Sequence, residues 1–168
     1  MTESATVDRP VTGPDPRLAT WRLLLSTFAR LSRRLDDELR TEHDLSLPEY
    51  EALLRIAEAE SGRMRMSQLA SEVELSKSGV TRLIDRLVVD GFVERSQCSH
   101  DARGAEAVLT ANGRRRLEAA RRTHLRSLDR FLMAPMDPSD RAALERAMTA
   151  IGREACEGRP RPGADEAC

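Results

Sequence analysis

Apolar residues recur at spacings of three and four near the N-terminus and predict one long helix. The residues of this series are Leu18, Trp21, Leu25, Phe28, Leu31, Leu35 and Leu39. They fall on one face of a helix that is predicted to end near His43. A second helix is predicted to begin after Ser46, a residue type that caps helix N-termini, with Pro48 in its first turn. It should run to Glu60, because Ser61–Gly62 stops it.

Two short helical segments follow, at residues 66–73 and 77–90. Two short helices with a tight joint are typical of a helix-turn-helix. Ser67 and Ser76 are candidate N-caps for these helices. Gly91 is predicted to end the second of them in the left-handed conformation that glycine adopts without strain.

After Gly91 the hydrophobic period changes from that of a helix to that of a strand. Residues 92–95 and 105–109 are short extended stretches, and the polar segment 98–104 is predicted to be the turn of a β-hairpin. Thr110 can cap a further long helix, which Pro135 should end. A last helix is then predicted from Asp137 to Ile151. The chain is therefore predicted to be mainly α, with a small β-hairpin wing.

Composition favours one soluble domain. The chain has 168 residues, of which 40% are hydrophobic and 33% charged, and its net charge is −1. No apolar run approaches the roughly 20 residues that span a bilayer. Residues 1–16 lack the apolar segment of a secretory signal, so we expect a cytoplasmic protein. Residues 1–16 and 156–168 are polar and rich in proline or glycine, and are expected to be disordered tails around a domain at 17–155.

The segment from Ser76 to Leu87 separates into two faces. Its apolar face consists of Val80, Leu83, Ile84 and Leu87. Its polar face carries short hydroxyls and long cations, which suit base edges and phosphates in a major groove about 12 Å wide. The candidate DNA contacts on this face are Ser76, Lys77, Ser78, Thr81, Arg82 and Arg86. An ordinary amphipathic helix with a solvated polar face is the alternative, and the hairpin that follows favours DNA binding.

The segment 75–87, followed by 90–95 and 101–104, resembles the MarR family of regulators. The resemblance covers roughly Trp21 to Ile151. It implies a winged helix-turn-helix lobe at about 46–110. It also implies that flanking dimerisation helices, at about 17–43 and 110–155, pair two chains.

The resemblance assigns roles to two wing residues. In such proteins an arginine of the wing enters the minor groove while an aspartate braces it, which corresponds here to Arg103 and Asp101. A narrow minor groove concentrates negative potential and attracts a guanidinium. A turn-stabilising ion pair between the two residues is the alternative.

The amphipathic terminal helices favour a homodimer, because a lone lobe cannot cover all of their apolar side chains. Two-fold symmetry would place the two DNA-reading helices roughly 34 Å apart, which predicts an inverted-repeat operator in double-stranded DNA. A monomeric helical domain is the alternative.

A further resemblance concerns an effector. Urate-responsive members of the family carry a Trp, an Asp and two Arg that hold an anionic ring, at positions that correspond to Trp21, Glu51, Arg82 and Arg95. An aromatic face with guanidinium groups suits a small planar anion. Alternatively, Trp21 belongs to the dimer interface and Arg82 contacts DNA.

Cys98 raises a second possibility for regulation. A thiol beside His100 and near Arg95 and Arg103 would have a lowered pKa and could sense oxidants. The redox-sensing relatives usually carry their thiol near the first helix, where this chain has no cysteine. The three cysteines are widely spaced and suit neither a disulfide framework nor a metal site.

The remaining function classes have little support. The sequence shows no nucleophile with a base and orienter, no phosphate-binding loop and no HExxH motif, so we expect no enzyme and no cofactor. His43 and His124 lack partners at metal-ligand spacing, so no metal is expected either. A helical protein-interaction module without DNA binding remains an alternative. The pattern predicts a ligand-responsive repressor that binds its operator as a homodimer.

Overall fold

The computed structural model describes residues 15–59, 61–73, 75–98 and 101–157, with backbone alone at 98, 101–104 and 156–157. Most of the two predicted tails lies outside these residues. The tail boundaries differ slightly from the prediction, because the first helix already begins at Pro16 and the last one reaches Glu157.

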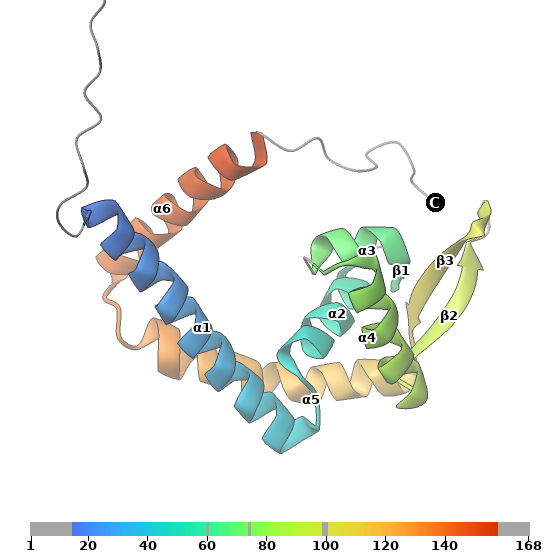
Figure 1. The fold of residues 1–168 in the computed structure, drawn as a ribbon. Helices are drawn as coiled ribbons and strands as arrows, with labels where there is room; N and C mark the ends of the chain where they lie inside the picture. The colour runs from blue at the N-terminus through green and yellow to red at the C-terminus, as the bar shows by residue number, and fades with distance from the viewer. Residues whose placement is uncertain (1–14, 60, 74, 99–100, 158–168) are drawn as a thin grey trace, which may run out of the picture.

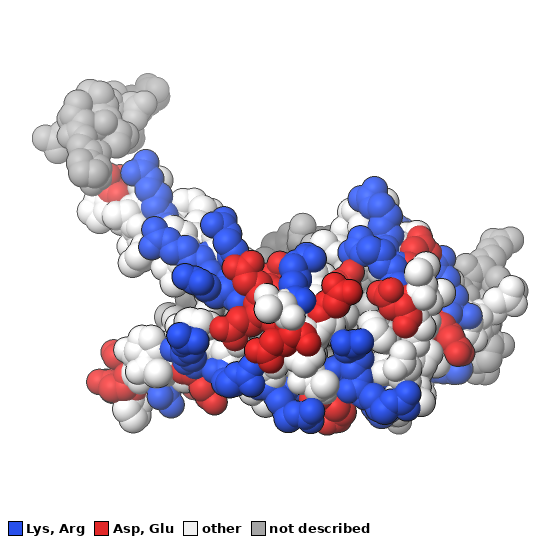
Figure 2. All heavy atoms as spheres, turned by 90° about the horizontal axis from the view of Figure 1, so that it is seen from below, with Lys and Arg blue, Asp and Glu red and all other residues white. Residues whose placement is uncertain are grey.

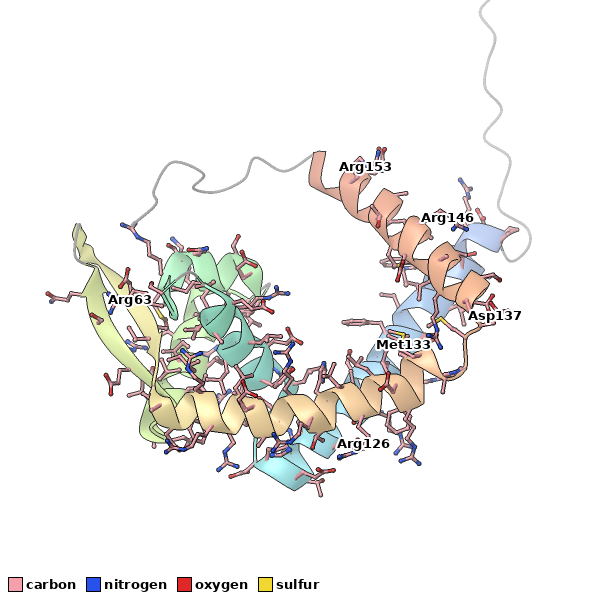
Figure 3. The ribbon with its side chains drawn as sticks, turned by 180° about the vertical axis from the view of Figure 1, so that it is seen from behind. Arg63, Arg126, Met133, Asp137, Arg146 and Arg153 are labelled. Atoms are coloured by element: carbon pink, nitrogen blue, oxygen red, sulfur yellow. The ribbon has the colours of Figure 1, made fainter. Side chains whose placement is uncertain are left out.

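The described chain is mainly helical with one small sheet, as predicted. Its elements are α1 (Pro16–His43), α2 (Leu47–Glu58), β1 (Arg63–Arg65), α3 (Met66–Glu72), α4 (Lys77–Val89), β2 (Val93–Cys98), β3 (Asp101–Leu109), α5 (Ala111–Leu128), the π-helix η1 (Asp129–Met133) and α6 (Pro138–Glu157). Figure 1 shows α2, α3, α4 and the sheet gathered into a lobe at one end of α5. Helix α6 follows the other end of α5 through η1, and α6 and the beginning of α1 both lie away from this lobe (Figures 1 and 3). None of the helices in the described ranges is long and apolar enough to cross a membrane.

The sheet is antiparallel with strand order β1-β3-β2. Strand β1 was not predicted, because three residues are too few to show a period. It follows Gly62, whose φ of 65° allows the preceding turn, and its middle residue Met64 is buried opposite Ala107. Its pairing with β3 ties the helix-turn-helix to the wing.

The predicted hairpin is present, but the prediction of a turn over residues 98–104 is wrong. Strand β2 continues to Cys98 and β3 begins at Asp101. The register shifts between Gln97 and Cys98, which pair with Ala105 and Asp101 respectively. Pairing to a neighbouring strand thus extends both strands into a polar segment that lacks strand periodicity.

Local capping chemistry sets most helix starts. Ser46 and Glu49 form a complete capping box at α2, and the hydroxyls of Ser76 and Thr110 each accept the backbone amide three residues further on, in α4 and α5. The prediction that Ser67 caps α3 is wrong. The helix begins at Met66, so Ser67 lies inside it, and the N-cap residue Arg65 makes no side-chain capping hydrogen bond. Gly91 has a φ of 70°, as predicted for the end of α4.

The helix predicted to run to Pro135 changes its hydrogen-bonding pattern. Regular α-helix ends at Leu128, and η1 follows as a π-helix. Arg141 Nη2 donates to the carbonyls of Met133 and Met136 at 3.0 and 3.3 Å, which satisfies acceptors at this helix end. Asp137 Oδ1 accepts the amides of Ser139 and Asp140 and thereby caps α6.

The core lies in the lobe and beneath it, and it leaves the beginning of α1 uncovered. Of the predicted apolar stripe on α1, only Leu35 and Leu39 are buried. Trp21 and Phe28 are 54% and 69% exposed. On α6, Ile151 is also exposed. The two terminal helices therefore present apolar side chains that the described residues do not cover.

Two glycines on helices allow a paired stability test. A Cβ at Gly113 would lie 2.0 Å from the carbonyl oxygen of Phe92, whereas none of the described residues has an atom within 4 Å of a Cβ at Gly152. Gly113→Ala should therefore lower the free energy of unfolding by about 1–3 kcal/mol, because backbone must shift. Gly152→Ala should raise it by about 0.5–1 kcal/mol, because alanine favours a helix interior. Urea unfolding of both variants measures these changes, and a neutral Gly113→Ala would contradict the close packing of α5 on Phe92.

Candidate nucleic-acid interface

Helix α4 has the two faces that the sequence predicted. Its apolar face is buried, with Val80, Leu83, Ile84 and Leu87 at most 2% exposed. The candidate DNA contacts on its other face are all exposed. This arrangement leaves one whole side of the helix available to a partner.

The hydroxyls on α4 are partly used by the helix itself. Ser76 Oγ accepts the amide of Gly79 at 3.1 Å and lies 3.2 Å from Ser78 Oγ. Thr81 Oγ1 donates to the carbonyl of Lys77 at 2.9 Å. Each hydroxyl can still accept or donate a further hydrogen bond, because an O–H has one donor and two acceptor sites.

Two cations on α4 have no partner among the described residues. Within that part of the chain, neither Lys77 nor Arg82 takes part in an ion pair or side-chain hydrogen bond. An exposed cation without an intramolecular partner can bind an anion without first breaking a contact. These two residues are the best-placed candidates for phosphate or base contacts.

The guanidinium of Arg86 forms an ion pair with the buried carboxylate of Glu49 on α2. Its Nε donates to Oε1 of Glu49 at 2.7 Å. The side chain of Glu49 is 12% exposed and that of Arg86 59% exposed. Burial would raise the pKa of Glu49, but hydrogen bonds from Ser46 and Arg86 outweigh this effect and hold the pKa below its ordinary value.

A second ion pair joins α4 to the wing. Arg95 Nη2 on β2 lies 2.7 Å from Oδ1 of Asp85, and it also donates to the carbonyl of Thr81 at 3.3 Å. Both contacts are made to the helix that carries the candidate DNA contacts. Arg95, which the sequence suggested for effector binding, thus links the wing to α4 in this structure.

The two predicted wing contacts lie at the beginning of β3. Asp101 is the first residue of the strand, and Arg103 falls in the stretch where the register with β2 shifts. Their side chains, and that of Cys98, lie outside the described residues. Groove insertion by Arg103 and oxidant sensing by Cys98 therefore remain predictions.

The structure does not join the four suggested effector residues. Trp21 is half exposed on α1, Arg82 is exposed on α4, and Arg95 is paired with Asp85. Burial raises the pKa of Glu51 on α2, although nearby Arg55 lowers it in part. Among the described residues, no hydrogen bond or ion pair connects any of the four to another.

His43 and His124 lie at the junction between α1, α2 and α5. His43 Nε2 lies 2.8 Å from Thr123 Oγ1, and Thr123 donates to Glu42. The ring of His124 packs on Tyr50 with centroids 4.5 Å apart. Within the described ranges, no group of three His, Cys, Asp or Glu residues could hold a metal ion.

Acid should destabilise the protein through His124. Burial lowers the pKa of His124, so the unfolded chain takes up a proton before the folded one does. The contribution of neutral His124 to the free energy of unfolding is then fully present above about pH 6.5 and is lost as pH falls below this value.

His124→Phe should flatten the pH dependence of the melting temperature between pH 7 and 5. In the described part of the chain, Nδ1 of His124 has no hydrogen-bond partner that the substitution would remove. An unchanged pH profile in this variant would exclude His124 as a source of the acid sensitivity.

The sequence did not predict the two ion pairs that connect α4 to its neighbours, Glu49–Arg86 and Asp85–Arg95. The spacing of Glu49 three residues after Ser46 is the signal of a capping box that could have drawn attention to it, but nothing local indicates that its second oxygen binds Arg86. Asp85 lies next to Arg86 in the chain and pairs in another direction, with Arg95. Contacts between residues so far apart in sequence depend on how the helices pack.

The three-helix lobe, its exposed helix α4 and the attached β2–β3 hairpin define a winged helix-turn-helix protein. Residues 45–104 match the family model described as the MarR family. The MarR family transcriptional regulator AbsC from Streptomyces coelicolor is 31% identical, with a TM-score of 0.79 over 88% of this chain and 98% of that chain. The chain belongs to the MarR family of transcriptional regulators.

Two further relatives are similar to this chain in fold or in sequence. Sco3205 from Streptomyces coelicolor, a MarR family regulator solved in complex with DNA, has the same fold, with a TM-score of 0.80 at 23% identity over 89% of this chain and 95% of that chain. The repressor YetL of Bacillus subtilis is 34% identical over 74 residues, which are 44% of this chain. This match covers 44% of the length of YetL, so the chain aligns with less than half of that relative.

Proposed function

We propose that the protein is a cytoplasmic regulator that binds double-stranded DNA through α4 and the wing and thereby represses transcription. The observation that carries the proposal is the exposed face of α4, where the described chain offers Lys77 and Arg82 no partner, above a fully buried apolar face. An α-helix fits the major groove, and long cations suit its phosphates and guanine edges. The neighbours Sco3205 and Escherichia coli MarR were both solved with DNA, which supports the same use of this fold here.

The proposed active form is a homodimer paired through α1 and α6. Its support is the set of exposed apolar side chains on these helices: Leu18, Trp21, Leu23, Leu24, Leu25, Phe28, Leu144, Met148 and Ile151. A monomer rarely leaves so large an apolar patch in water. A two-fold dimer would present two α4 helices to an inverted repeat.

A gel-shift assay on the DNA that flanks the protein's own gene tests the proposal. A specific shift that survives excess random-sequence DNA is expected. Footprinting should then reveal an inverted repeat. No shift at any flanking sequence, with the dimer intact, would favour the alternative of a helical protein-interaction module.

The wing can be tested separately. Arg103→Ala should weaken operator binding by about 1–3 kcal/mol, as expected when one guanidinium is removed from the minor groove. Circular dichroism should be unchanged, because the substitution lies at the end of the hairpin. If affinity for the operator stays the same, the minor-groove role of Arg103 is wrong and the ion pair with Asp101 becomes the better interpretation.

Relief of repression by a small planar anion is the regulatory part of the proposal. Trp21 is the only tryptophan, so its fluorescence can report a ligand bound near α1. Titrating urate and salicylate with and without operator gives both affinities, and linkage requires that ligand and DNA weaken each other by the same factor. A ligand that quenches Trp21 but leaves operator affinity unchanged would exclude this coupling.

Oxidation of Cys98 is the competing mechanism. If peroxide treatment abolishes DNA binding and Cys98→Ser prevents this loss, the result would support oxidation.

A further inference from the structure

The carboxylate of Glu49 connects the beginning of α2 to α4. Its Oε2 accepts both the amide and the hydroxyl of Ser46, at 2.8 and 2.7 Å, which begins α2. Its Oε1 accepts Nε of Arg86 on α4. Next to Ser46, the amide of Leu47 donates to Asp36 of α1 at 2.7 Å. The beginning of α2 is thus held by α1 and in turn holds α4.

The bond between Glu49 and Arg86 uses only one edge of the guanidinium. Nε faces the buried carboxylate, and in the described part of the chain the two Nη atoms make no hydrogen bond within the protein. The side chain of Arg86 is 59% exposed. A guanidinium is planar and carries its donors in a rigid fork, so fixing Nε also fixes where the Nη donors point.

We propose that Glu49 is a positioning residue for DNA binding, which orients Arg86 so that its outer edge meets a DNA phosphate. This inference rests on the proposed function, since it assumes that α4 faces DNA. Glu49 itself touches no DNA, because its side chain is buried beneath α4. Arg86 differs in this respect from Lys77 and Arg82, which the described residues leave unconstrained.

The proposal and simple electrostatics predict opposite changes in DNA affinity for Glu49→Gln. Glu49→Gln removes a negative charge near the phosphates, which by long-range electrostatics alone should tighten DNA binding. It also weakens the hold on Arg86, which under the proposal loosens binding. Glutamine can still complete a capping box, so α2 should remain formed. The sign of the change in affinity therefore distinguishes the two expectations.

The experiment uses the full chain and a random-sequence DNA duplex at low salt, because a phosphate contact does not depend on base sequence. Glu49→Gln is expected to weaken binding about tenfold, with an unchanged circular dichroism spectrum and a modestly lower melting temperature that leaves the protein folded at the assay temperature, because the charged hydrogen bonds of Glu49 contribute to stability. Arg86→Ala should weaken it as much, and should make the salt dependence shallower by about 0.9 in log–log slope for each phosphate that is no longer neutralised. In the Arg86→Ala background, Glu49→Gln should have no further effect.

Arg86→Lys provides the conservative comparison. A lysine has one ammonium group in place of a fork, so it cannot hold Glu49 and reach a phosphate with separately directed donors. It should leave binding close to that of Arg86→Ala. Full affinity with lysine would show that only the charge matters and would overturn the positioning role.

Two results separate this inference from the proposed function. If the unsubstituted protein does not bind the duplex at low salt, both fail together. If it binds, but Glu49→Gln tightens binding or acts equally with and without Arg86, the proposed function stands and the role of Glu49 is wrong.

Discussion

Replacing Lys77 and Arg82 together by alanine is expected to lower DNA affinity about 1000-fold. A two-fold dimer presents each side chain twice, so the double variant removes four cations from the interface with DNA. At about 1 kcal/mol or more for each, affinity falls by about 4 kcal/mol, and every 1.4 kcal/mol is about a factor of ten. Neither side chain has a partner in the described chain, so folding should not suffer. Fluorescence anisotropy with the operator at fixed salt measures the change.

The matched control removes the same charge elsewhere. Arg121 and Arg122 are adjacent exposed residues on α5, outside the helix-turn-helix. Replacing both by alanine should reduce affinity only slightly, through the overall field of the protein. An equal reduction in the two double variants would show that α4 makes no specific contact and that only net charge governs binding. Figure 2 shows that basic side chains occur in many places on the surface, which makes this control necessary.

Phe28→Asp is expected to separate the homodimer into monomers. Phe28 is 69% exposed on α1 and belongs to the apolar surface that we assign to the dimer interface. Burying an unpaired carboxylate there would cost several kcal/mol, because a charge leaves water without compensation. Light scattering should show the monomer mass. Operator affinity should fall at least about 100-fold. In the dimer, binding of the first lobe holds the second lobe close to its half-site, and a monomer lacks this advantage.

Val89→Asp serves as the control for this substitution. Val89 is 85% exposed at the end of α4, in the lobe and away from α1 and α6. The same change of side chain there should leave the dimer intact. A dimer that survives Phe28→Asp, or one that Val89→Asp also breaks, would contradict the assignment of the interface to the terminal helices.

The sequence by itself determined the features that depend on neighbouring residues. The starts of α2, α4 and α5 follow from Ser46, Ser76 and Thr110, because a capping hydroxyl acts on amides two or three residues away. The two faces of α4 follow from a helical period within one short segment. The resemblance carried by that segment also led to the correct family and fold class.

Tertiary structure alone decided the features that depend on distant partners. Strand β1 forms because its residues pair with β3, where Met64 lies opposite Ala107. Strands β2 and β3 extend into a polar segment because their backbones form hydrogen bonds with each other. The apolar period of α1 indicated one buried face, but only the packing showed that this chain covers the end near Leu35 and leaves Phe28 exposed. Likewise, the sequence around Ser46 indicated only the start of a helix, and the packing of α2 against α4 brought Glu49 to Arg86. A local pattern encodes which face of a helix avoids water, whereas the chain topology determines which side chains meet that face.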